Sequence, residues 1–429
     1  MRQTAVILGL GTFGGGLGAA RHLARLGYEV LITDLRSAND LAEPLAGLKP
    51  ELDNGSVALR LGTNDPADAA ACDLLIVNPA IKRPWENPCV LAALSAGARV
   101  ATEIALALDA LPVSCTRVGI TGSAGKSTTA AMIHAGLVAA GRTAHLGGNI
   151  GGSLLDRLGA IGDGDTVVVE VSSAQLWWLD QPNALESNRW FDAAVVTNLA
   201  ENHLDWHGTF DHYATSKYVL TERLRPDAAA VLGEGVTNFP TTANKLTPAD
   251  DDALPQLTLA GEYNRLNAKL AIAACSALGV NSDEAATGIA EFRGLPHRLQ
   301  LVREHRGVRY INDSKSTTPR ATSLAVQAFG GAPVHLIVGG SDKGTDLKPI
   351  ADLAAETRSL LCIGATGTTI AAMAGIKPVE TLEQAVTTAS LHAEPGDVVL
   401  LSPGCASFDQ FDNFEHRGER FTQLVHSLT

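Results

Sequence analysis

The chain has 429 residues, a formal net charge of −13, 45% hydrophobic and 18% charged residues. This composition is too apolar for a disordered protein, and the length allows about three domains of roughly 150 residues each. The acidic balance argues against nucleic acid or an anionic membrane surface as a partner, so any bound nucleotide would need local neutralisation by a metal ion and lysine.

The N-terminal region predicts a strand, a glycine turn, a helix over 14–26 and a second strand. The turn carries Gly9, Gly11 and Gly14 in the spacing G-x-G-x-x-G, and Asp34 follows at the end of the second strand. This combination is frequent in dinucleotide sites. It leaves three interpretations open: an NAD site, a site for another nucleotide, or a turn that binds nothing.

Further strands are predicted over 73–81 and 98–103, and the first domain should end near residue 112. The apolar run over 5–10 is too short for a signal peptide, and no apolar span of 18 residues occurs. The six cysteines form no C-x-x-C pair, which suits a reducing compartment. We therefore expect a cytoplasmic protein without a membrane partner, and a monomer.

A phosphate-binding loop is predicted between a strand over 117–121 and a helix over 127–140. The loop consists of Gly122, Ser123, Ala124 and Gly125, whose backbone N–H groups can surround phosphate oxygens. Lys126 can then reach the β and γ phosphates, and the next residue, a serine, can ligate magnesium. Ile120 replaces the first glycine of the usual pattern, so a structural turn with an incidental lysine is the alternative.

Two apolar strands, over 166–173 and 192–199, end in polar residues on the carboxyl side, where an α/β site would lie. Glu170 lies inside the first of them, and a buried carboxylate there requires either a metal or nearby N–H donors. His203, Asp205 and His207 cluster after the second. The polar stretch over 234–256 is predicted to be a loop or a weak hairpin.

The last third of the chain alternates strands and helices and predicts a doubly wound sheet. Polar clusters over 313–318, 339–343 and 402–407 follow three of its strands, which favours a binding edge. Asp412 and Glu415 have the spacing of a capping box, and Phe414 between them is either a core residue or part of a site.

Eight segments occur in this order along the chain: GITGSAGKSTT, VVVEVSSAQL, TNLAENHLDWHGT, GEYNRLNAKLA, GLPHR, INDSKSTTP, GGSDKG and LLSPGCASFDQFDNFEHRG. With these segments the chain resembles the Mur ligases of peptidoglycan synthesis. The resemblance implies an α/β fold of three domains: a Rossmann-like UDP-substrate domain over 1–112, a central ATP-binding P-loop domain over 113–296, and a Rossmann-like amino-acid-binding domain over 297–429.

The resemblance also implies roles for individual residues. Its ATP site comprises Gly122, Ser123, Ala124, Gly125, Lys126, Ser127, Thr128, Asn264, Asn267, Arg298 and Asp313. Its metal and catalytic set comprises Lys126, Ser127, Glu170, His203 and Lys217, the last as a carbamate. Its UDP-substrate set comprises Gly9, Gly11, Gly14, Asp34, Arg36 and Asn149, and its glutamate set comprises Lys315, Thr317, Lys343, Ser407 and Phe414.

The implied reaction uses ATP and Mg²⁺ to join D-glutamate to UDP-N-acetylmuramoyl-L-alanine through an acyl phosphate. L-glutamate or another amino acid is the nearest alternative, since a few pocket side chains decide this. A folylpolyglutamate synthase, a P-loop kinase, an NAD-dependent oxidoreductase and a non-catalytic UDP-sugar binder are more distant alternatives. The chain departs from the family pattern at Ala174, at Tyr263 and over 78–81.

Overall fold

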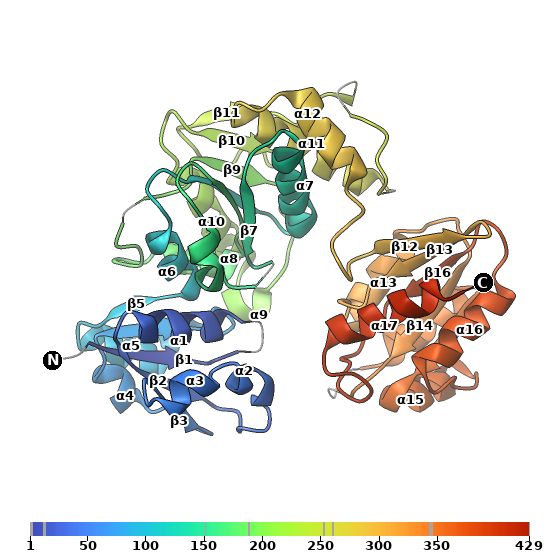
Figure 1. Cartoon of the computed structure of the whole chain (residues 1–429), viewed down its shortest axis with the longest axis horizontal. Coiled ribbons are helices and arrows are strands. Elements are labelled where there is room, and N and C mark those ends of the chain that lie inside the picture. Colours follow the sequence, from blue (N-terminus) through green and yellow to red (C-terminus); the bar gives the residue numbers. More distant parts are fainter. Residues whose placement is uncertain are drawn as a thin grey trace. The chain divides into compact units, whose positions relative to one another are not determined.

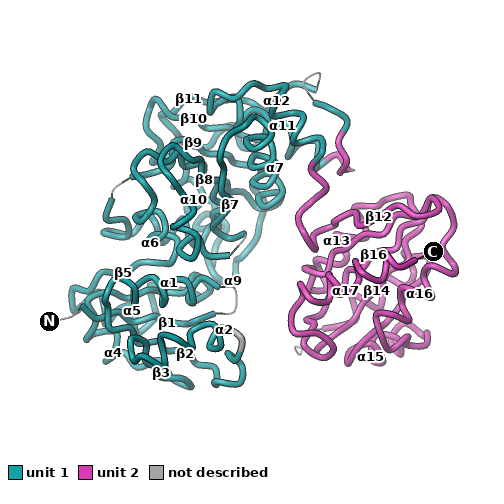
Figure 2. The backbone as a smooth tube through the Cα atoms, viewed as in Figure 1, with its two compact units in different colours: residues 1–256, 263–291 teal, residues 257–262, 292–429 magenta. Residues whose placement is uncertain are grey.

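The computed structural model describes residues 3–11, 14–150, 152–187, 189–251, 254–259, 261–342 and 346–428. The backbone forms two compact units, one of Met1–Gln256 with Tyr263–Glu291 and one of Leu257–Glu262 with Phe292–Thr429 (Figure 2). The first unit contains two β-sheets and the second contains one, each packed with helices (Figure 1). The predicted α/β class is confirmed.

The first sheet is parallel, with strand order β3-β2-β1-β4-β5. Its strands are β1 (Thr4–Leu8), β2 (Glu29–Asp34), β3 (Val57–Leu61), β4 (Leu74–Val77) and β5 (Arg99–Ala101). Its helices are α1 (Gly15–Arg25), α2 (Ala42–Ala46), α3 (Lys49–Asp53), α4 (Pro66–Ala70), η1 (Pro84–Glu86), α5 (Pro88–Ser95) and α6 (Glu103–Ala110).

Strand β1 explains why the first sheet is covered on both faces. Ala5 and Ile7 pack into the core that contains α1, whereas Val6 and Leu8 pack into the core that contains α5. Successive side chains of a strand point to opposite faces, so a strand with helices on both sides has to be apolar throughout.

The second sheet is also parallel, in the order β11-β10-β9-β6-β8-β7. Its strands are β6 (Thr116–Thr121), β7 (Ala144–Gly148), β8 (Thr166–Glu170), β9 (Ala193–Val196), β10 (Ala229–Leu232) and β11 (Asn244–Leu246). Its helices are α7 (Lys126–Ala139), η2 (Leu154–Ala160), α8 (Ser173–Leu179), α9 (Leu204–His207), α10 (Phe210–Glu222), α11 (Glu262–Ala277) and α12 (Ser282–Glu291).

The stretch over 234–256 differs from its prediction as a loop or weak hairpin. It contributes β11, which pairs in parallel with β10. A parallel partner cannot be reached by a tight turn, and the residues between the two strands make this longer connection. The strand has only three residues, Asn244–Leu246, and is largely exposed, so it carries no hydrophobic alternation that the sequence could reveal.

The third sheet has the order β12-β13-β16-β14-β15, and only β12 runs antiparallel to its neighbour. Its strands are β12 (Gln300–His305), β13 (Val308–Asn312), β14 (Val334–Gly339), β15 (Ser359–Ile363) and β16 (Val398–Leu401). Its helices are α13 (Pro319–Gln327), α14 (Lys348–Asp352), η4 (Leu353–Ala355), α15 (Gly364–Ala374), α16 (Leu382–His392) and α17 (Phe414–His426).

Helix α17 begins one residue later than the capping-box spacing predicts. Asn413 is the N-cap, and its side chain accepts a hydrogen bond from the backbone N–H of His416. Asn is as good an N-cap as Asp, so the sequence offered two adjacent candidates and the structure uses the second.

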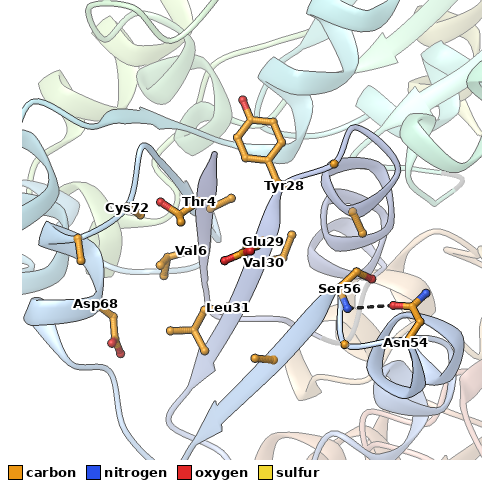
Figure 3. A pocket seen from close by; sticks show the side chains of 16 residues that line it. Thr4, Val6, Tyr28, Glu29, Val30, Leu31, Asn54, Ser56, Asp68 and Cys72 are labelled. Carbon is orange, nitrogen blue, oxygen red and sulfur yellow. Dashed lines mark hydrogen bonds between the residues drawn. The ribbon is translucent and has the colours of Figure 1, made fainter. Parts of the chain in front are cut away.

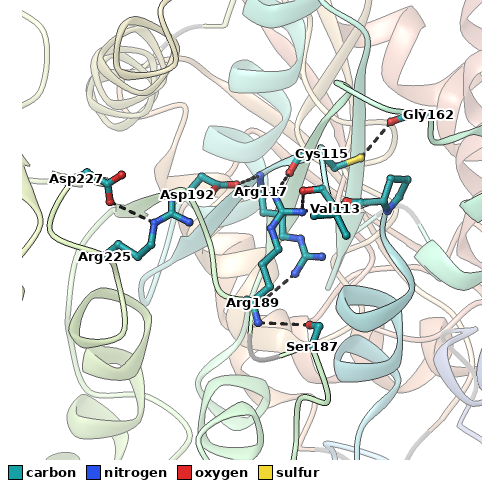
Figure 4. A network of polar contacts seen from close by, with 10 residues as sticks. Val113, Cys115, Arg117, Gly162, Ser187, Arg189, Asp192, Arg225 and Asp227 are labelled. Carbon is teal, nitrogen blue, oxygen red and sulfur yellow. Dashed lines mark hydrogen bonds and ion pairs between the residues drawn. The ribbon is translucent and has the colours of Figure 1, made fainter.

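Hydrogen bonds fix the segment that joins the first sheet to the second (Figure 4). The guanidinium of Arg189 donates to the carbonyl oxygens of Pro112, at 3.1 Å, and of Cys115. Arg117 is fully buried, and its backbone N–H donates to Asp192 at 2.9 Å. Burial lowers the pKa of Arg117 to about 10, so its side chain is still charged at neutral pH.

In the part of the chain that the structure describes, no helix is both long and apolar enough to cross a membrane.

Candidate active site

The phosphate-binding loop lies between β6 and α7 and depends on two glycines. Gly125 is the N-cap of α7 with φ 81°, and Gly122 has φ 143°. A Cβ on Gly122 would lie 1.9 Å from Thr197 Oγ1, and one on Gly125 would lie 2.5 Å from Asn267 Oδ1. Backbone conformation and close packing therefore both require glycine at these positions.

Side chains that follow β9 hold the loop in place. Thr197 Oγ1 donates to the carbonyl of Ala124 at 2.6 Å, and Asn198 both accepts from the Ala124 N–H at 2.9 Å and donates to its carbonyl at 3.0 Å. Ser123 Oγ is hydrogen-bonded to Tyr213 at 2.8 Å. The motif predicts the loop but not these supporting residues, whose only sequence signal is polarity at a strand end.

Ser127 and Glu170 form the buried acidic part of the site. Ser127 Oγ donates to Glu170 Oε2 at 2.7 Å, and both residues are buried. The Asn149 amide donates to Glu170 Oε1 at 3.4 Å, and its backbone N–H donates to the Glu170 carbonyl at 2.8 Å. Lys126 Nζ contacts the Ser123 carbonyl at 3.2 Å. The junction of β6 and α7 is thus surrounded by Ser123, Lys126, Ser127, Asn149 and Glu170.

Lys217 on α10 reaches the same junction from the other side. Its side chain is 1% exposed, and Nζ donates to the Gly122 carbonyl at 2.8 Å and to Thr121 Oγ1 at 3.3 Å. Burial, aided by the charge of Lys126, holds the pKa of Lys217 well below its usual range, while Glu170 acts in the opposite direction. A lowered pKa increases the share of neutral amine, which is the nucleophilic form that carbamylation by CO₂ requires.

The oxygen donors fit a magnesium ion. Mg²⁺ prefers one or two protein oxygen ligands and keeps phosphate and water in its other positions, and Ser127 and Glu170 supply a hydroxyl and a carboxylate. Among the described residues no group of three or more His, Cys, Asp and Glu side chains is placed to hold a metal. The role of Lys217 as a carbamate ligand stays a prediction.

His203 is the N-cap of α9 and adopts a left-handed conformation with φ 51°. Desolvation, followed by the charges of Lys126 and Lys217, lowers its pKa. A neutral imidazole can ligate a metal, and these electrostatic contacts place His203 in the neighbourhood of both lysines.

The predicted adenine-side residues lie on α11, which packs beside the loop. Asn264 and Asn267 are both buried, and Asn267 Oδ1 accepts a hydrogen bond from Thr129 Oγ1 at 3.2 Å. Thr128, which precedes Thr129 in α7, is half-buried. The roles of these residues as ATP ligands stay predictions.

The glycine turn after β1 has Gly9, Gly11 and Gly14 at φ 84°, 72° and 86°. Asp34 closes the turn, since its Oδ2 accepts from the Leu10 N–H at 3.0 Å and from Arg36 at 2.8 Å. Burial opposes ionisation of Asp34, but hydrogen bonds from Arg36 outweigh it and lower the pKa of Asp34. The pair is therefore ionised, and the Arg36 side chain is partly exposed.

Asn78, which follows β4, packs against the same turn. Its amide donates to the Gly9 carbonyl at 3.3 Å, and a Cβ on Gly11 would lie 2.6 Å from its nitrogen. Its Oδ1 accepts from the Ala80 N–H at 3.0 Å. The departure from the family pattern over 78–81 thus has a structural role, which we did not predict. Residues 12 and 13 of the turn lie outside the described residues.

In the second unit, Asp313 follows β13 and is buried. Oδ1 accepts from the Leu299 N–H at 3.1 Å and Oδ2 from Ser402 Oγ at 2.7 Å. Burial raises the pKa of Asp313 to about 6, although hydrogen bonds from Ser316 and Ser402 and the charge of Arg298 act against it. Asp313 and Arg298 are therefore close enough to interact electrostatically. Their shared role at ATP stays a prediction.

The predicted glutamate-binding residues that the structure describes lie in the loops after β13 and β16 and at the start of α17. Lys315 Nζ lies 4.0 Å from the centre of the Phe414 ring, a cation–π distance. Ser407 is buried after β16, and Thr317 is half-buried in the loop after β13. Lys343 lies outside the described residues. Phe414 is half-buried beneath a charged amine, and its role in binding stays a prediction.

Arg417 organises these loops and is a residue that we did not predict. It is 1% exposed, and its guanidinium donates to the carbonyls of Ser314, Cys405 and Ala406 at 2.9–3.2 Å. Its Nε also donates to Ser314 Oγ at 2.9 Å. One buried cation thus links the loop after β13 to the loop after β16. Arg417 lies in the segment FEHRG, which we used for the family resemblance without giving this arginine a role.

A hollow of about 640 Å³ lies elsewhere in the first sheet (Figure 3). It is lined by Thr4 and Val6 of β1, Glu29 and Leu31 of β2, and Cys72 among others. Thr4 and Glu29 begin their strands, so this hollow opens at the amino end of the sheet. The predicted site residues follow the carboxyl ends, where ligands bind in open α/β sheets, and we do not assign this hollow to the site.

Comparison with known proteins identifies the family. Residues 120–254 match the Mur ligase middle domain, and residues 297–405 match the Mur ligase glutamate ligase domain. A protein of Geobacter metallireducens called UDP-N-acetylmuramoylalanine--D-glutamate ligase is 35% identical, over 98% of this chain and 97% of its own length. The chain belongs to the Mur ligase family. A relative with the same name from Geobacillus kaustophilus is also 35% identical to this Mur ligase, over 98% of the chain and 97% of its own length.

Solved structures agree on the fold. UDP-N-acetylmuramate-alanine ligase from Thermotoga maritima matches with a TM-score of 0.59 at 16% identity, covering 99% of this Mur ligase and 100% of that chain. At this identity the likeness concerns the fold alone. The assignment to the family from the sequence is thus confirmed. The phosphate loop, Glu170, His203 and Lys217 lie within the first matched segment, whereas Ser407 and Phe414 lie beyond the end of the second.

Proposed function

We propose that the protein is an ATP-dependent, ADP-forming ligase that adds D-glutamate to UDP-N-acetylmuramoyl-L-alanine in peptidoglycan synthesis. The observation that carries the proposal is the placement of Lys126, Ser127, Glu170 and the buried Lys217 around one phosphate loop. The comparisons support it, because relatives named for this reaction are 35% identical to the chain over nearly its full length. The family assignment leaves no place for the kinase and oxidoreductase alternatives.

The first half of the reaction is phosphoryl transfer from ATP to the free carboxylate of the muramoyl-alanine. Such a transfer depends on positioning and charge neutralisation more than on covalent chemistry. Lys126 and the N–H groups of the loop would hold the phosphates, and Asn149 would hold the accepting carboxylate beside them. Asn149 is itself fixed by Glu170 through backbone and side-chain hydrogen bonds.

The proposal includes Mg²⁺ held by Ser127, Glu170, His203 and the carbamate of Lys217. When bound, the ion would neutralise the phosphate charge that one lysine cannot balance. Carbamylation exchanges a buried cation for an anion, which removes the repulsion between Lys217 and Lys126. Desolvation keeps His203 neutral, as ligation requires.

The second half of the reaction is attack by the glutamate amine on the carbonyl carbon of the acyl phosphate, followed by collapse of the tetrahedral intermediate to amide and phosphate. The incoming glutamate carries a side-chain carboxylate that needs a cation. We propose Lys315, beside Phe414, for this carboxylate, with Thr317, Ser407 and Lys343 as further contacts.

We extend the proposal to a monomer in the cytoplasm that acts on small molecules without nucleic acid or membrane. All six cysteines are buried thiols, which suits a reducing compartment. Size-exclusion chromatography with light scattering tests the monomer, and a mass near that of a dimer at working concentration would contradict it.

The test of the function is phosphate release from ATP with UDP-N-acetylmuramoyl-L-alanine and either D- or L-glutamate. We expect release with D-glutamate only, and none from Lys126→Ala. Release with L-glutamate alone would retain the ligase chemistry but change the substrate.

A further inference from the structure

An aromatic cluster joins the two halves of the first unit. We call it the aromatic bridge and define it as Trp85, Trp177, Trp206 and His212. The ring of Trp85, in η1 of the first-sheet part, lies 5.4 Å from Trp177, 5.5 Å from Trp206 and 4.9 Å from His212. Those three come from α8, α9 and α10 of the second-sheet part (Figure 1). Aromatic pairs at such distances attract beyond their burial.

One polar contact of the bridge is directed at the loop after β4. The indole N–H of Trp206 donates to the Pro79 carbonyl at 3.0 Å, and Trp206 is 6% exposed. Pro79 follows Asn78, which donates a hydrogen bond to the Gly9 carbonyl of the glycine turn. An exposed ion pair between Lys82 and Asp205, at 2.8 Å, lies beside this contact and adds little by itself.

The other end of the bridge is the turn that carries His203. The backbone N–H groups of Trp206 and His207 both donate to the His203 carbonyl at 3.0 Å. His207 is buried and is held by Ser173 and His212, at 2.9 Å each. The turn is therefore positioned by residues that belong to, or contact, the bridge.

Backbone strain marks both ends. Arg83, next to η1, has φ 45°, and His203 has φ 51°. A non-glycine residue in the left-handed region is strained and persists only where its surroundings determine it. The bridge supplies these surroundings, since Trp85 and Trp206 lie two and three residues from the strained positions and pack against each other.

We propose that Trp206 is a positioning residue that holds the loop over 78–81 at a fixed separation from the His203 turn, and so aligns the UDP-linked substrate with the phosphoryl-transfer site. The inference rests on the proposed function, because it concerns the binding of that substrate. If the bridge served only to pack the two parts together, a change in it would lower the stability of the protein without raising KM for one substrate more than for another.

The test is steady-state kinetics of Trp206→Phe, which keeps an aromatic ring and removes the N–H. Trp190→Phe is the matched control, because the Trp190 indole also donates to a backbone carbonyl, that of Leu220, at 3.0 Å, away from the bridge. We expect Trp206→Phe to raise KM for the UDP-linked substrate about fivefold to tenfold, the effect of one lost hydrogen bond. KM for ATP should stay within about twofold, and Trp190→Phe should change neither.

Equal kinetic effects of the two variants, or a lower Tm of Trp206→Phe with unchanged KM values, would overturn the inference. If Trp206→Phe does not fold, Trp85→Phe alters the facing ring from the first-sheet side and has the same expected and contrary results. Wild-type enzyme is measured first. No turnover by wild type would overturn the proposed function together with this inference, whereas turnover with an unchanged KM in the variant would overturn the inference alone.

Discussion

The replacement Arg417→Met tests how the amino-acid edge of the second unit is built. Methionine approximates the apolar stem of the side chain and removes the guanidinium. The wild-type group makes hydrogen bonds to three carbonyls and to one hydroxyl of two separate loops. Burial lowers the pKa of Arg417 to about 10, so the group is charged at neutral pH and its hydrogen bonds are charge-assisted.

The size of the effect follows from the groups left behind. A buried acceptor without a partner costs about 1–3 kcal/mol. The carbonyls of Ser314 and Cys405 would lose their donor, whereas the Ala406 carbonyl would keep the backbone N–H of Ser341 at 2.9 Å. Removal of a buried charge recovers part of this, because its desolvation cost disappears. We expect a net loss of about 3 kcal/mol in the unfolding free energy of the second unit. Displacement of the two loops should also weaken the binding of D-glutamate. We expect its KM to rise more than about tenfold, which corresponds to a loss of about 1.4 kcal/mol in binding free energy.

The assay combines urea unfolding, followed by a probe in the second unit, with steady-state kinetics. Arg420→Met is the control from the same helix, because Arg420 forms a largely exposed ion pair with Glu383 at 2.8 Å. Exposed pairs contribute about 0–1 kcal/mol, so this variant should resemble wild type. Equal stabilities and equal KM values for the two variants would refute the assignment of Arg417 as the link between the loops.

Three further predictions concern both units. Gly122→Ala should raise KM for ATP at least about tenfold, because the new Cβ would lie 1.9 Å from Thr197 Oγ1. Gly141→Ala is the control: Gly141 also has a positive φ, 75°, but no atom lies within 4 Å of the new Cβ, and KM for ATP should not change. Lys217→Arg cannot form a carbamate and should lower kcat more than about 100-fold. The activity of the wild type should rise when bicarbonate is added. A wild-type activity that does not change with bicarbonate would count against carbamylation. The folded pKa of Asp313, about 6, exceeds the unfolded value, so the stability that its protonation provides is lost as pH rises from about 4 through 6. This loss is about 3 kcal/mol. In urea titrations Asp313→Asn should remove this contribution from the pH dependence of stability, whereas that of Glu103, whose pKa is raised to about 7, should remain.

The sequence predicted the elements that carry strong periodicity. The strand before the phosphate loop and the helix after it appear as β6 and α7 within about a residue of their expected bounds, because glycines mark their junction and both elements are buried. Strand β11 was missed, since Asn244–Leu246 has neither alternation nor burial. Strand β7, Ala144–Gly148, was missed as well, and its two glycines are poor strand formers.

For the site, sequence patterns indicated candidate binding residues better than the residues that hold the loops in place. A carboxylate inside an apolar strand indicated Glu170. A polar cluster after an apolar strand indicated Asp313, because the carboxyl ends of parallel strands share one edge. Thr197 and Arg417 act through backbone carbonyls of distant loops. Such contacts depend on tertiary packing and leave no local spacing, so only the structure could identify them.

The measurement that tests the central claim most directly is phosphate release from ATP in the presence of UDP-N-acetylmuramoyl-L-alanine, with D-glutamate, L-glutamate or neither added, for wild type and for Lys126→Ala. The account predicts release that depends on D-glutamate and on Lys126, with one amide formed for each phosphate. Release that does not depend on either glutamate, or that persists undiminished in Lys126→Ala, would contradict it.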